Sequence, residues 1–184
     1  IQADHLSEGD QRAINEAIRQ LDLSYSPYSG FSVGAGIVLA DGTILGGSNQ
    51  ENASYPLCMC AERVALYHLS AAKPGTKVLT MAITARNQNG IIERAVFPCG
   101  ACRQVILEYE RIQKSPIRLL IYTRSAKVLV AESGASILPF AFDESFPYSL
   151  HLPHNHIANC VVYTGTHDNN TIKGWWQNEI KPIQ

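Results

Sequence analysis

The sequence lacks any long hydrophobic run and any excess of charge of one sign. In its 184 residues no apolar stretch approaches the roughly 20 residues that a membrane-spanning helix needs, so we expect no transmembrane segment. Lysine and arginine together number 15, aspartate and glutamate 16, and the formal net charge is −1. No overall positive field exists to hold a nucleic-acid backbone or an anionic membrane. We therefore expect a small, weakly charged ligand and neither a nucleic-acid nor a membrane partner.

Cysteine is scarce, and its number is odd. Five cysteines in 184 residues do not form the even, dense set that is typical of a small secreted domain held by disulfides. From Ile1 onward, no basic stretch followed by an apolar one opens the sequence, so no secretory signal is predicted. We expect a protein of the reducing cytoplasm.

Helical and strand-like segments alternate along the chain, whose 46% of hydrophobic residues suffice for one globular domain. Helices are predicted over 7–21, with Ser7 or Asp10 as its cap, 60–72 and 99–111, and strands over 33–39, 43–45, 78–85, 117–122 and 127–131. Asp41-Gly42 turns the first two strands into a hairpin. This alternation favours a sheet covered on both faces, with the ligand near the helix starts at the strand ends.

Three cysteines lie at the predicted starts of two helices. Cys99 and Cys102, in Pro-Cys-Gly-Ala-Cys-Arg-Gln, are one helical turn apart, and Cys60 opens the preceding helix within Cys-Ala-Glu-Arg. Helix N-termini favour the thiolate over the thiol. Three thiolates leave one tetrahedral position of a Zn²⁺ ion open, which is typical of a catalytic zinc site. We therefore predict one Zn²⁺ per chain, bound by these three sulfurs.

Two other interpretations of these cysteines remain open. A Cys-x-x-Cys pair is also typical of a redox site, although Cys60-Ala61-Glu62 on the neighbouring helix argues against it. A structural zinc site needs a fourth ligand, for which Cys58 is the nearest candidate. Cys58 lies only two residues before Cys60, so we do not expect both to reach one ion. We expect Cys58 to be an ordinary half-buried thiol.

Cys-Ala-Glu on one helix, followed by Pro-Cys-x-x-Cys on the next, resembles the small three-cysteine branch of the cytidine deaminase family. The resemblance covers about residues 6–146 and includes the segments 28–35, 49–56 and 138–142. It implies a three-layer α-β-α sandwich around a mixed five-stranded sheet, a bound Zn²⁺ and a homotetramer. It also implies a catalytic domain over 1–146 and an extension over 147–184 that is not an independent domain.

The resemblance implies an enzyme for the zinc-dependent hydrolysis of cytidine and deoxycytidine to uridine or deoxyuridine and ammonia, in pyrimidine salvage. Glu62 would move protons from the attacking water to ring nitrogen 3 and the departing amine. Arg63 matches a residue whose guanidinium bonds the thiolates. The related nucleic-acid deaminases carry His in place of Cys60 and need a basic surface, and this chain has neither. The alternatives are a structural zinc or binding protein on this scaffold, or a deaminase of another cytosine nucleoside analogue.

Substrate contacts are implied at further positions. Asn49 and Glu51 match the pair that holds the ribose 3′-hydroxyl, a grip suited to a nucleoside and hostile to a phosphate at that place. Phe31 matches the aromatic residue that packs on the pyrimidine. The other expected contacts are Ala61 and two aromatic residues that reach into a neighbouring subunit's site in the tetrameric family, Tyr55 and Phe142. Two departures from the family pattern, Met59 and Phe97, put the shape of the pocket in question.

The end of the chain differs in composition from the rest. Residues 151–184 hold four of the six histidines and both tryptophans. Residues 159–176 resemble the catalytic-loop segment of the 4-α-glucanotransferases, whose site needs a whole barrel, so we predict no glycoside activity. We expect Trp175 and Trp176 to pack on a neighbouring subunit. The alternatives are a fusion or frame error that joins two genes, a segment borrowed from another protein, and zinc binding by His151, His154, His156 and Cys160.

Overall fold

The computed structural model describes residues 1–139, 141 and 142. The expectations for Trp175, Trp176 and the histidines near the end of the chain lie outside these residues. The chain separates into two units, Ile1–Ala141 and Phe142–Gln184, and the first holds every helix and strand of the described part. The domain end predicted at residue 146 stays a prediction.

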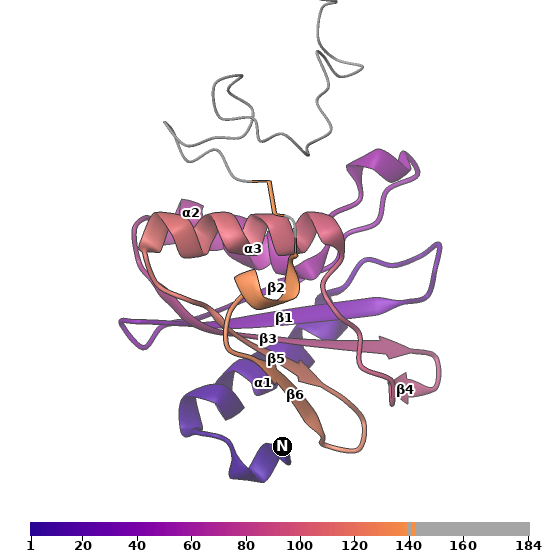
Figure 1. Cartoon of the computed structure of the whole chain (residues 1–184). Helices are drawn as coiled ribbons and strands as arrows, with labels where there is room; N and C mark the ends of the chain where they lie inside the picture. The colour runs from indigo at the N-terminus through magenta and orange to yellow at the C-terminus, as the bar shows by residue number, and fades with distance from the viewer. Residues whose placement is uncertain (140, 143–184) are drawn as a thin grey trace, which may run out of the picture. The chain divides into compact units, whose positions relative to one another are not determined.

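Three helices and six strands follow one another along the described chain (Figure 1). In order they are α1 (Glu8–Gln20), β1 (Ser32–Leu39), β2 (Ile44–Ser48), α2 (Ala61–Ala72), β3 (Val78–Asn87), β4 (Gly90–Ile91), α3 (Gly100–Gln113), β5 (Arg118–Tyr122) and β6 (Val128–Ala131). Short 3₁₀ turns accompany them: η1 (Ala3–His5), η2 (Leu21–Leu23), η3 (Tyr55–Leu57) and η4 (Ala135–Ile137). All eight predicted segments are confirmed, and each end lies within three residues of its predicted position.

The strands form one mixed sheet in the order β2-β1-β3-β5-β6. β3 and β5 are parallel, and the other pairs along this order are antiparallel. The sheet has six strands and not the expected five, because β4 pairs with the end of β3. β4 has only two residues, too few to show an alternating pattern in the sequence.

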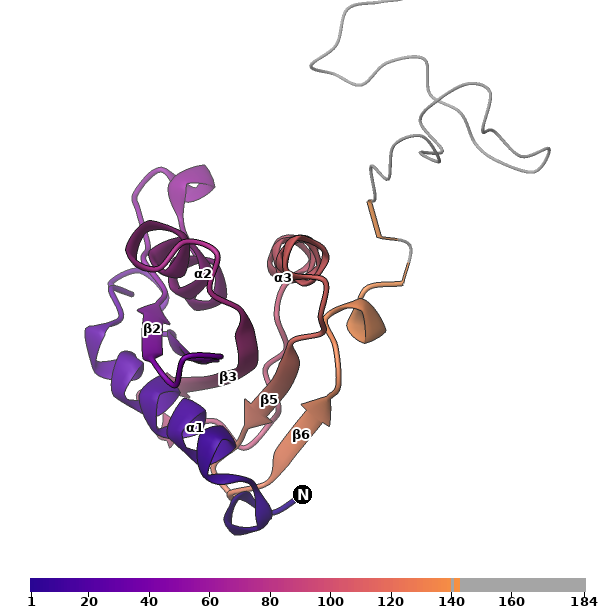
Figure 2. The same cartoon turned by 90° about the vertical axis from the view of Figure 1, so that its left-hand side faces the viewer.

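Helices cover both faces of this sheet, which confirms the expected three layers. Figures 1 and 2 show α1 on one face and α2 with α3 on the other. On the α1 face, Ala13 and Ala17 belong to a buried cluster with Val38, Ala82 and Leu120. A second cluster of buried apolar side chains lies on the opposite face, between the sheet and the helices α2 and α3.

Local chemistry explains how α1 begins and how closely it packs. The Ser7 side chain caps the helix by accepting a hydrogen bond from the backbone N–H of Asp10 at 3.1 Å. Asp10 is not a cap: it is buried, and it accepts a hydrogen bond from the Thr80 hydroxyl at 3.1 Å. A Cβ atom on Gly36 would lie only 2.2 Å from the Ala13 carbonyl oxygen, so the strand needs glycine here.

The strand directions bring the starts of α2 and α3 to one edge of the sheet. β1 is antiparallel to both β2 and β3, so β2 and β3 point the same way. α2 follows β2 along the chain, and α3 follows β3 and its short partner β4. Both helices therefore begin beyond the same edge, where their positively polarised N-termini meet. None of the helices in the described residues is long and apolar enough to cross a membrane.

Candidate active site

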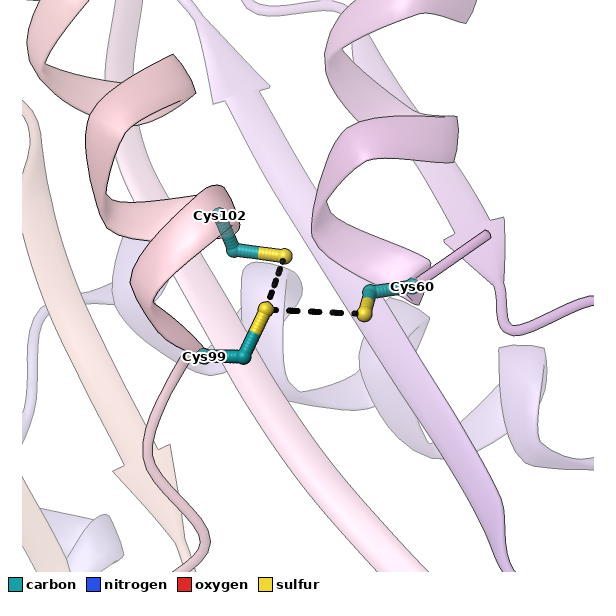
Figure 3. Close-up of side chains that lie close together, drawn as sticks. All are labelled: Cys60, Cys99 and Cys102. Carbon is teal, nitrogen blue, oxygen red and sulfur yellow. Dashed lines mark hydrogen bonds between the residues drawn. The ribbon is translucent and has the colours of Figure 1, made fainter. Parts of the chain in front are cut away.

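Three sulfurs meet where α2 and α3 begin (Figure 3). Cys60 and Cys99 are the N-cap residues of α2 and α3, and Cys102 is the third residue of α3. The Cys99 Sγ lies 3.4 Å from the Cys102 Sγ and 3.8 Å from the Cys60 Sγ, and all three lie within 4.8 Å of one another. The fold thus brings together residues that are about forty positions apart in the sequence.

The spacing of the sulfurs fits a Zn²⁺ ion. Zinc–sulfur bonds of about 2.3 Å in a tetrahedron place neighbouring sulfurs about 3.8 Å apart. The separations of 3.4 and 3.8 Å are close to this value. Cys58 is not part of the cluster: its Sγ lies 3.3 Å from the backbone nitrogen of Asn52 and 3.6 Å from the Asn52 carbonyl oxygen. Within the described residues, the sulfur cluster therefore has three members, and no fourth protein ligand closes it.

The surroundings of the sulfurs favour negative charge at Cys60. The pKa of Cys60 falls to about 5, because the Cys102 thiol donates a hydrogen bond to its sulfur and the Arg63 guanidinium adds another. The Arg63 Nη2 lies 3.8 Å from the Cys60 Sγ. The pKa of Cys102 rises, because its thiol is the donor to Cys60 and is fully buried. Thiolate is the form of cysteine that binds zinc.

Glu62 is buried next to the sulfur cluster. It is the second residue of α2, is 4% exposed, and lines the same pocket as Cys60 and Cys99. Burial raises the pKa of its carboxyl group, since the charged form loses its hydration. A buried carboxyl at a pocket wall is a candidate for proton transfer.

The pocket beside the sulfurs has a volume of about 310 Å³, at the lower end of the range for small-molecule sites. Its wall comes from the start of β1, the loop between β2 and α2, and the loop before α3. The lining residues are Ser29, Phe31, Val33, Asn49, Gln50, Glu51, Cys58, Met59, Cys60, Glu62, Ile83, Val96, Phe97 and Cys99.

Asn49 is a wall residue whose side chain is largely used by the protein itself. Its Oδ1 accepts hydrogen bonds from the Val33 backbone N–H at 2.7 Å and from the Ser24 hydroxyl at 2.6 Å. Its Nδ2 donates to the Phe31 carbonyl oxygen at 3.0 Å. Both acceptor positions of the amide oxygen are thus filled, and a ligand can receive one remaining N–H.

Glu51 is held by the turn that precedes β1. Its Oε2 accepts from the backbone N–H groups of Tyr28 at 2.9 Å and Ser29 at 3.3 Å, and its Oε1 accepts from the Ser29 hydroxyl at 2.5 Å. The Ser29 hydroxyl and the Tyr28 N–H lower the pKa of Glu51 below its ordinary value, because both hydrogen bonds stabilise the charged carboxylate. Ser29 was not among the predicted site residues, although it lies within the segment 28–35 that resembles the family.

Not all of the other expected substrate contacts lie at the pocket. Phe31 lines the pocket, whereas Ala61 and Tyr55 are not among its lining residues. Ala61 is fully buried under the sheet's glycine Gly47, whose added Cβ atom would lie 2.5 Å from the Ala61 carbonyl oxygen. Tyr55 is 70% exposed, and its ring meets the Tyr28 ring edge-on at 6.4 Å. Phe142 is 54% exposed.

Met59 and Phe97, the two departures from the family pattern, both line the pocket. Phe97 is 50% exposed, so it forms part of the mouth. These residues therefore affect the shape of the cavity, while the three sulfurs keep their mutual spacing.

Comparison with known proteins covers most of the described chain. The sequence model of the cytidine and deoxycytidylate deaminase zinc-binding region matches residues 7–118. The cytidine deaminase of Halalkalibacterium halodurans is 46% identical over 53% of this chain and 70% of its own length. That of Sporosarcina psychrophila is 38% identical over 73% of this chain and 91% of its own. The crystal structure of the Burkholderia pseudomallei cytidine deaminase, 36% identical, superposes with a TM-score of 0.63 over 74% of this chain and all of that one.

A second family matches the end of the chain. The sequence model of the 4-alpha-glucanotransferases matches residues 126–182. The chloroplastic/amyloplastic 4-alpha-glucanotransferase of Solanum tuberosum is 63% identical over 43 residues, which are 23% of this chain and only 7% of that enzyme. The family-model match begins earlier than the segment predicted from the sequence. Its first residues include β6 and η4, which belong to the first unit.

Proposed function

Because the chain belongs to the cytidine and deoxycytidylate deaminase family, we propose that it hydrolyses cytidine and deoxycytidine to uridine or deoxyuridine and ammonia. The observation that carries this proposal is the buried Glu62 on the wall of a pocket that also contains Cys60 and Cys99. The carbon–nitrogen bond at pyrimidine carbon 4 breaks, a carbon–oxygen bond to water forms, and the amine leaves as ammonia. We place this reaction in cytoplasmic pyrimidine salvage.

Cys60, Cys99 and Cys102 would hold one Zn²⁺ per chain, which supplies Lewis acidity that activates water. Three thiolates outweigh the charge of the ion and leave the centre with a charge of about −1. The Arg63 guanidinium, 3.8 Å from the Cys60 sulfur, offsets this charge, and so do the N-termini of α2 and α3.

Glu62 moves the protons. Its position two residues after Cys60 places its carboxyl group at the pocket wall without making it a member of the sulfur cluster. From there it takes a proton from the attacking water, delivers it to ring nitrogen 3, and carries the second proton to the departing amine. One carboxyl group thus transfers both protons of the water, so water attack and amine release need no other acid in the pocket.

Asn49 and Glu51 select a sugar hydroxyl. Asn49 has one N–H left to donate, and Glu51 keeps acceptor capacity on its charged carboxylate. A hydroxyl group both accepts and donates, so the 3′-hydroxyl of a nucleoside satisfies the pair. A phosphate at that position carries negative charge and would be repelled by Glu51. Nothing in this pair addresses the 2′-position, which supports turnover of both cytidine and deoxycytidine.

We also infer a homotetramer in which Tyr55 and Phe142 complete the neighbouring subunit's site. Tyr55 and Leu57, the first and last residues of η3, are 70% and 66% exposed, and Tyr28, in contact with Tyr55, is 53% exposed. Such a group of exposed large apolar side chains near a pocket is typical of a subunit contact.

The test is to incubate the purified protein with cytidine, deoxycytidine and cytidine 3′-phosphate while following the ultraviolet change from cytosine to uracil. We expect turnover of the two nucleosides, no turnover of the 3′-phosphate, one zinc per chain and a tetrameric mass by light scattering. Full zinc occupancy without turnover of either nucleoside would refute the enzyme and favour a structural zinc protein. Efficient turnover of the 3′-phosphate would refute the role given to Glu51.

A further inference from the structure

The three sulfurs are held by different parts of the backbone. Cys102 lies inside α3 and is fully buried. Cys60 follows Met59, whose N–H and carbonyl oxygen both pair with Gln50 at 2.9 Å. Cys99 is exposed and follows a stretch, 92–98, that contains neither helix nor strand. The direction of the Cys99 side chain therefore depends most on contacts outside regular secondary structure.

Arg103 provides such a contact. It lies one helical turn after Cys99 on α3, and its side chain runs back towards the helix start. Its Nε donates a hydrogen bond at 2.8 Å to the carbonyl oxygen of Pro98, the residue immediately before Cys99. That carbonyl belongs to the peptide that leads into Cys99, so the bond fixes the plane from which the Cys99 side chain departs. Pro98 has no N–H of its own to add a second anchor.

The Arg103 guanidinium is itself held from the other side. Its Nη1 donates to the Ile137 carbonyl oxygen in η4 at 3.1 Å. Glu110, seven residues later on α3, accepts from the backbone N–H groups of Gly134 at 2.6 Å and Ala135 at 3.0 Å. α3 thus binds η4 at two places on one helix face. A planar guanidinium fixed between two carbonyl groups has little freedom to release either.

We propose that Arg103 is a positioning residue that aims the Cys99 sulfur at the metal. It acts through the Pro98 carbonyl group and uses η4 as its support. This inference rests on the proposed zinc site. Lysine cannot replace arginine fully, because a single ammonium group lacks the fork of donors that bonds both carbonyls.

The test compares Arg103→Ala and Arg103→Lys with the unmodified full-length chain. Arg124→Ala is the matched control, because the Arg124 guanidinium also donates to two backbone carbonyl groups, those of Ile91 in β4 and of Asn89 in the turn before it. Each protein is loaded with Zn²⁺ to measure its release to a chelator and the kinetics with cytidine. Each is also loaded with Co²⁺, whose visible absorption depends on the coordination geometry.

In Arg103→Ala we expect zinc release to accelerate and kcat to fall, each by about 10–100-fold, as for other residues that orient a metal ligand. In the same variant we expect KM to stay the same and the cobalt bands to shift. Arg103→Lys should lie between Arg103→Ala and the unmodified chain in each of these measurements, and Arg124→Ala should match the unmodified chain.

If Arg103→Ala folds, releases zinc at the same rate as the unmodified chain and has the same cobalt bands, the inference is overturned. If Arg103→Ala does not fold, the same measurements on Arg103→Lys decide, and bands identical to those of the unmodified chain overturn it. An unmodified chain that holds zinc but does not turn over cytidine refutes the proposed function instead, while the zinc-release and cobalt measurements still test Arg103.

Discussion

Compared with the face of the sheet under α1, the face under α2 and α3 combines a core with a reactive edge. On the α1 face, small residues bring the backbones of helix and strand together, as Gly36 and Ala13 do. The buried Asp10 on that face is bonded to Thr80 and lies 3.4 Å from the Arg118 guanidinium. On the other face, the helix starts beyond the core hold the three sulfurs and Glu62.

The difference indicates how one sheet serves two purposes. Close packing between backbones resists added volume, at Gly36 on the α1 face as at Gly47 under α2, so such positions act on the stability of the unit. Helix starts have unpaired N–H groups and a positive dipole end, so the edge of the α2/α3 face can stabilise thiolates. Substitutions on the two faces should therefore have separable effects on stability and on chemistry.

The sharpest test of the reactive side is Glu62→Gln. We expect the variant to lose turnover of cytidine by about 10²–10⁴-fold, because the amide cannot transfer protons. Zinc content should stay at one per chain, since Glu62 is not among the clustered sulfurs. The free energy of unfolding should not fall, because the substitution removes a buried ionisable group and keeps its shape. Turnover close to that of the unmodified chain would show that another group moves the protons.

The matching test of the α1 face is Gly36→Ala. The new Cβ atom would lie 2.2 Å from the Ala13 carbonyl oxygen and 2.8 Å from the Ala17 nitrogen, both of which belong to the backbone. We expect a loss of about 2–3 kcal/mol in the free energy of unfolding, measured by chemical denaturation. The folded fraction should keep the kcat of the unmodified chain.

Gly9→Ala is the control for this substitution. Gly9 lies at the start of α1, and an added Cβ atom would meet the Ser7 hydroxyl at an ordinary 3.9 Å. Alanine favours a helix over glycine by up to about 1 kcal/mol, so this variant should be slightly more stable. A similar loss of stability in both variants would contradict the contrast between the packed strand and the open helix start.

A smaller effect is expected from Glu51→Gln, which acts on substrate binding. The loss of a charged acceptor should raise KM for cytidine about tenfold and change kcat little. Ser29→Ala is the matched control: it leaves the carboxylate but removes the hydroxyl group that most lowers its pKa. The pKa of Glu51 should then rise towards its ordinary value. The rise in KM on acidification should begin at a higher pH in Ser29→Ala than in the unmodified chain.

Removal of residues 147–184 should have the smallest effect on the reaction. A match to 74% of this chain accounts for the whole length of the Burkholderia pseudomallei cytidine deaminase. This supports a catalytic domain that ends near residue 146. We expect unchanged kcat and KM for cytidine and no activity on maltodextrins with or without the segment. Loss of turnover on truncation would show that the segment belongs to the catalytic unit.

Most of the fold could be predicted because its elements are long and regular. Apolar residues three or four apart are typical of α1 and α3, and Ser7 marks the start of α1. β4 could not be predicted, since two residues show no period and its pairing with β3 depends on the turn that leads into Gly90, whose φ is +96°. The burial of Asp10 was missed, because its partners Thr80 and Arg118 are far away in the sequence.

The candidate site, too, has a part that the sequence could predict and a part that it could not. The motif around Cys99 and the Cys-Ala-Glu of α2 contain enough local information to predict a shared metal site, which the clustered sulfurs fit. The partners of Asn49 and the role of Arg103 could not be predicted. Apart from the Ser24 hydroxyl on Asn49, their hydrogen bonds go to carbonyl and N–H groups of the backbone, which almost every residue has, so no residue type marks them in the sequence.

By itself, the sequence determined the order of helices and strands, the family and the three cysteines proposed as metal ligands, because each depends on residue types at short spacing. Only the tertiary structure decided that Cys60 meets Cys99 and Cys102, that Glu62 is buried at a pocket wall, and that Cys58 stays apart. The reason is that two antiparallel pairings through β1 make β2 and β3 point the same way. The helices that follow them therefore begin at one edge, where distant residues become neighbours.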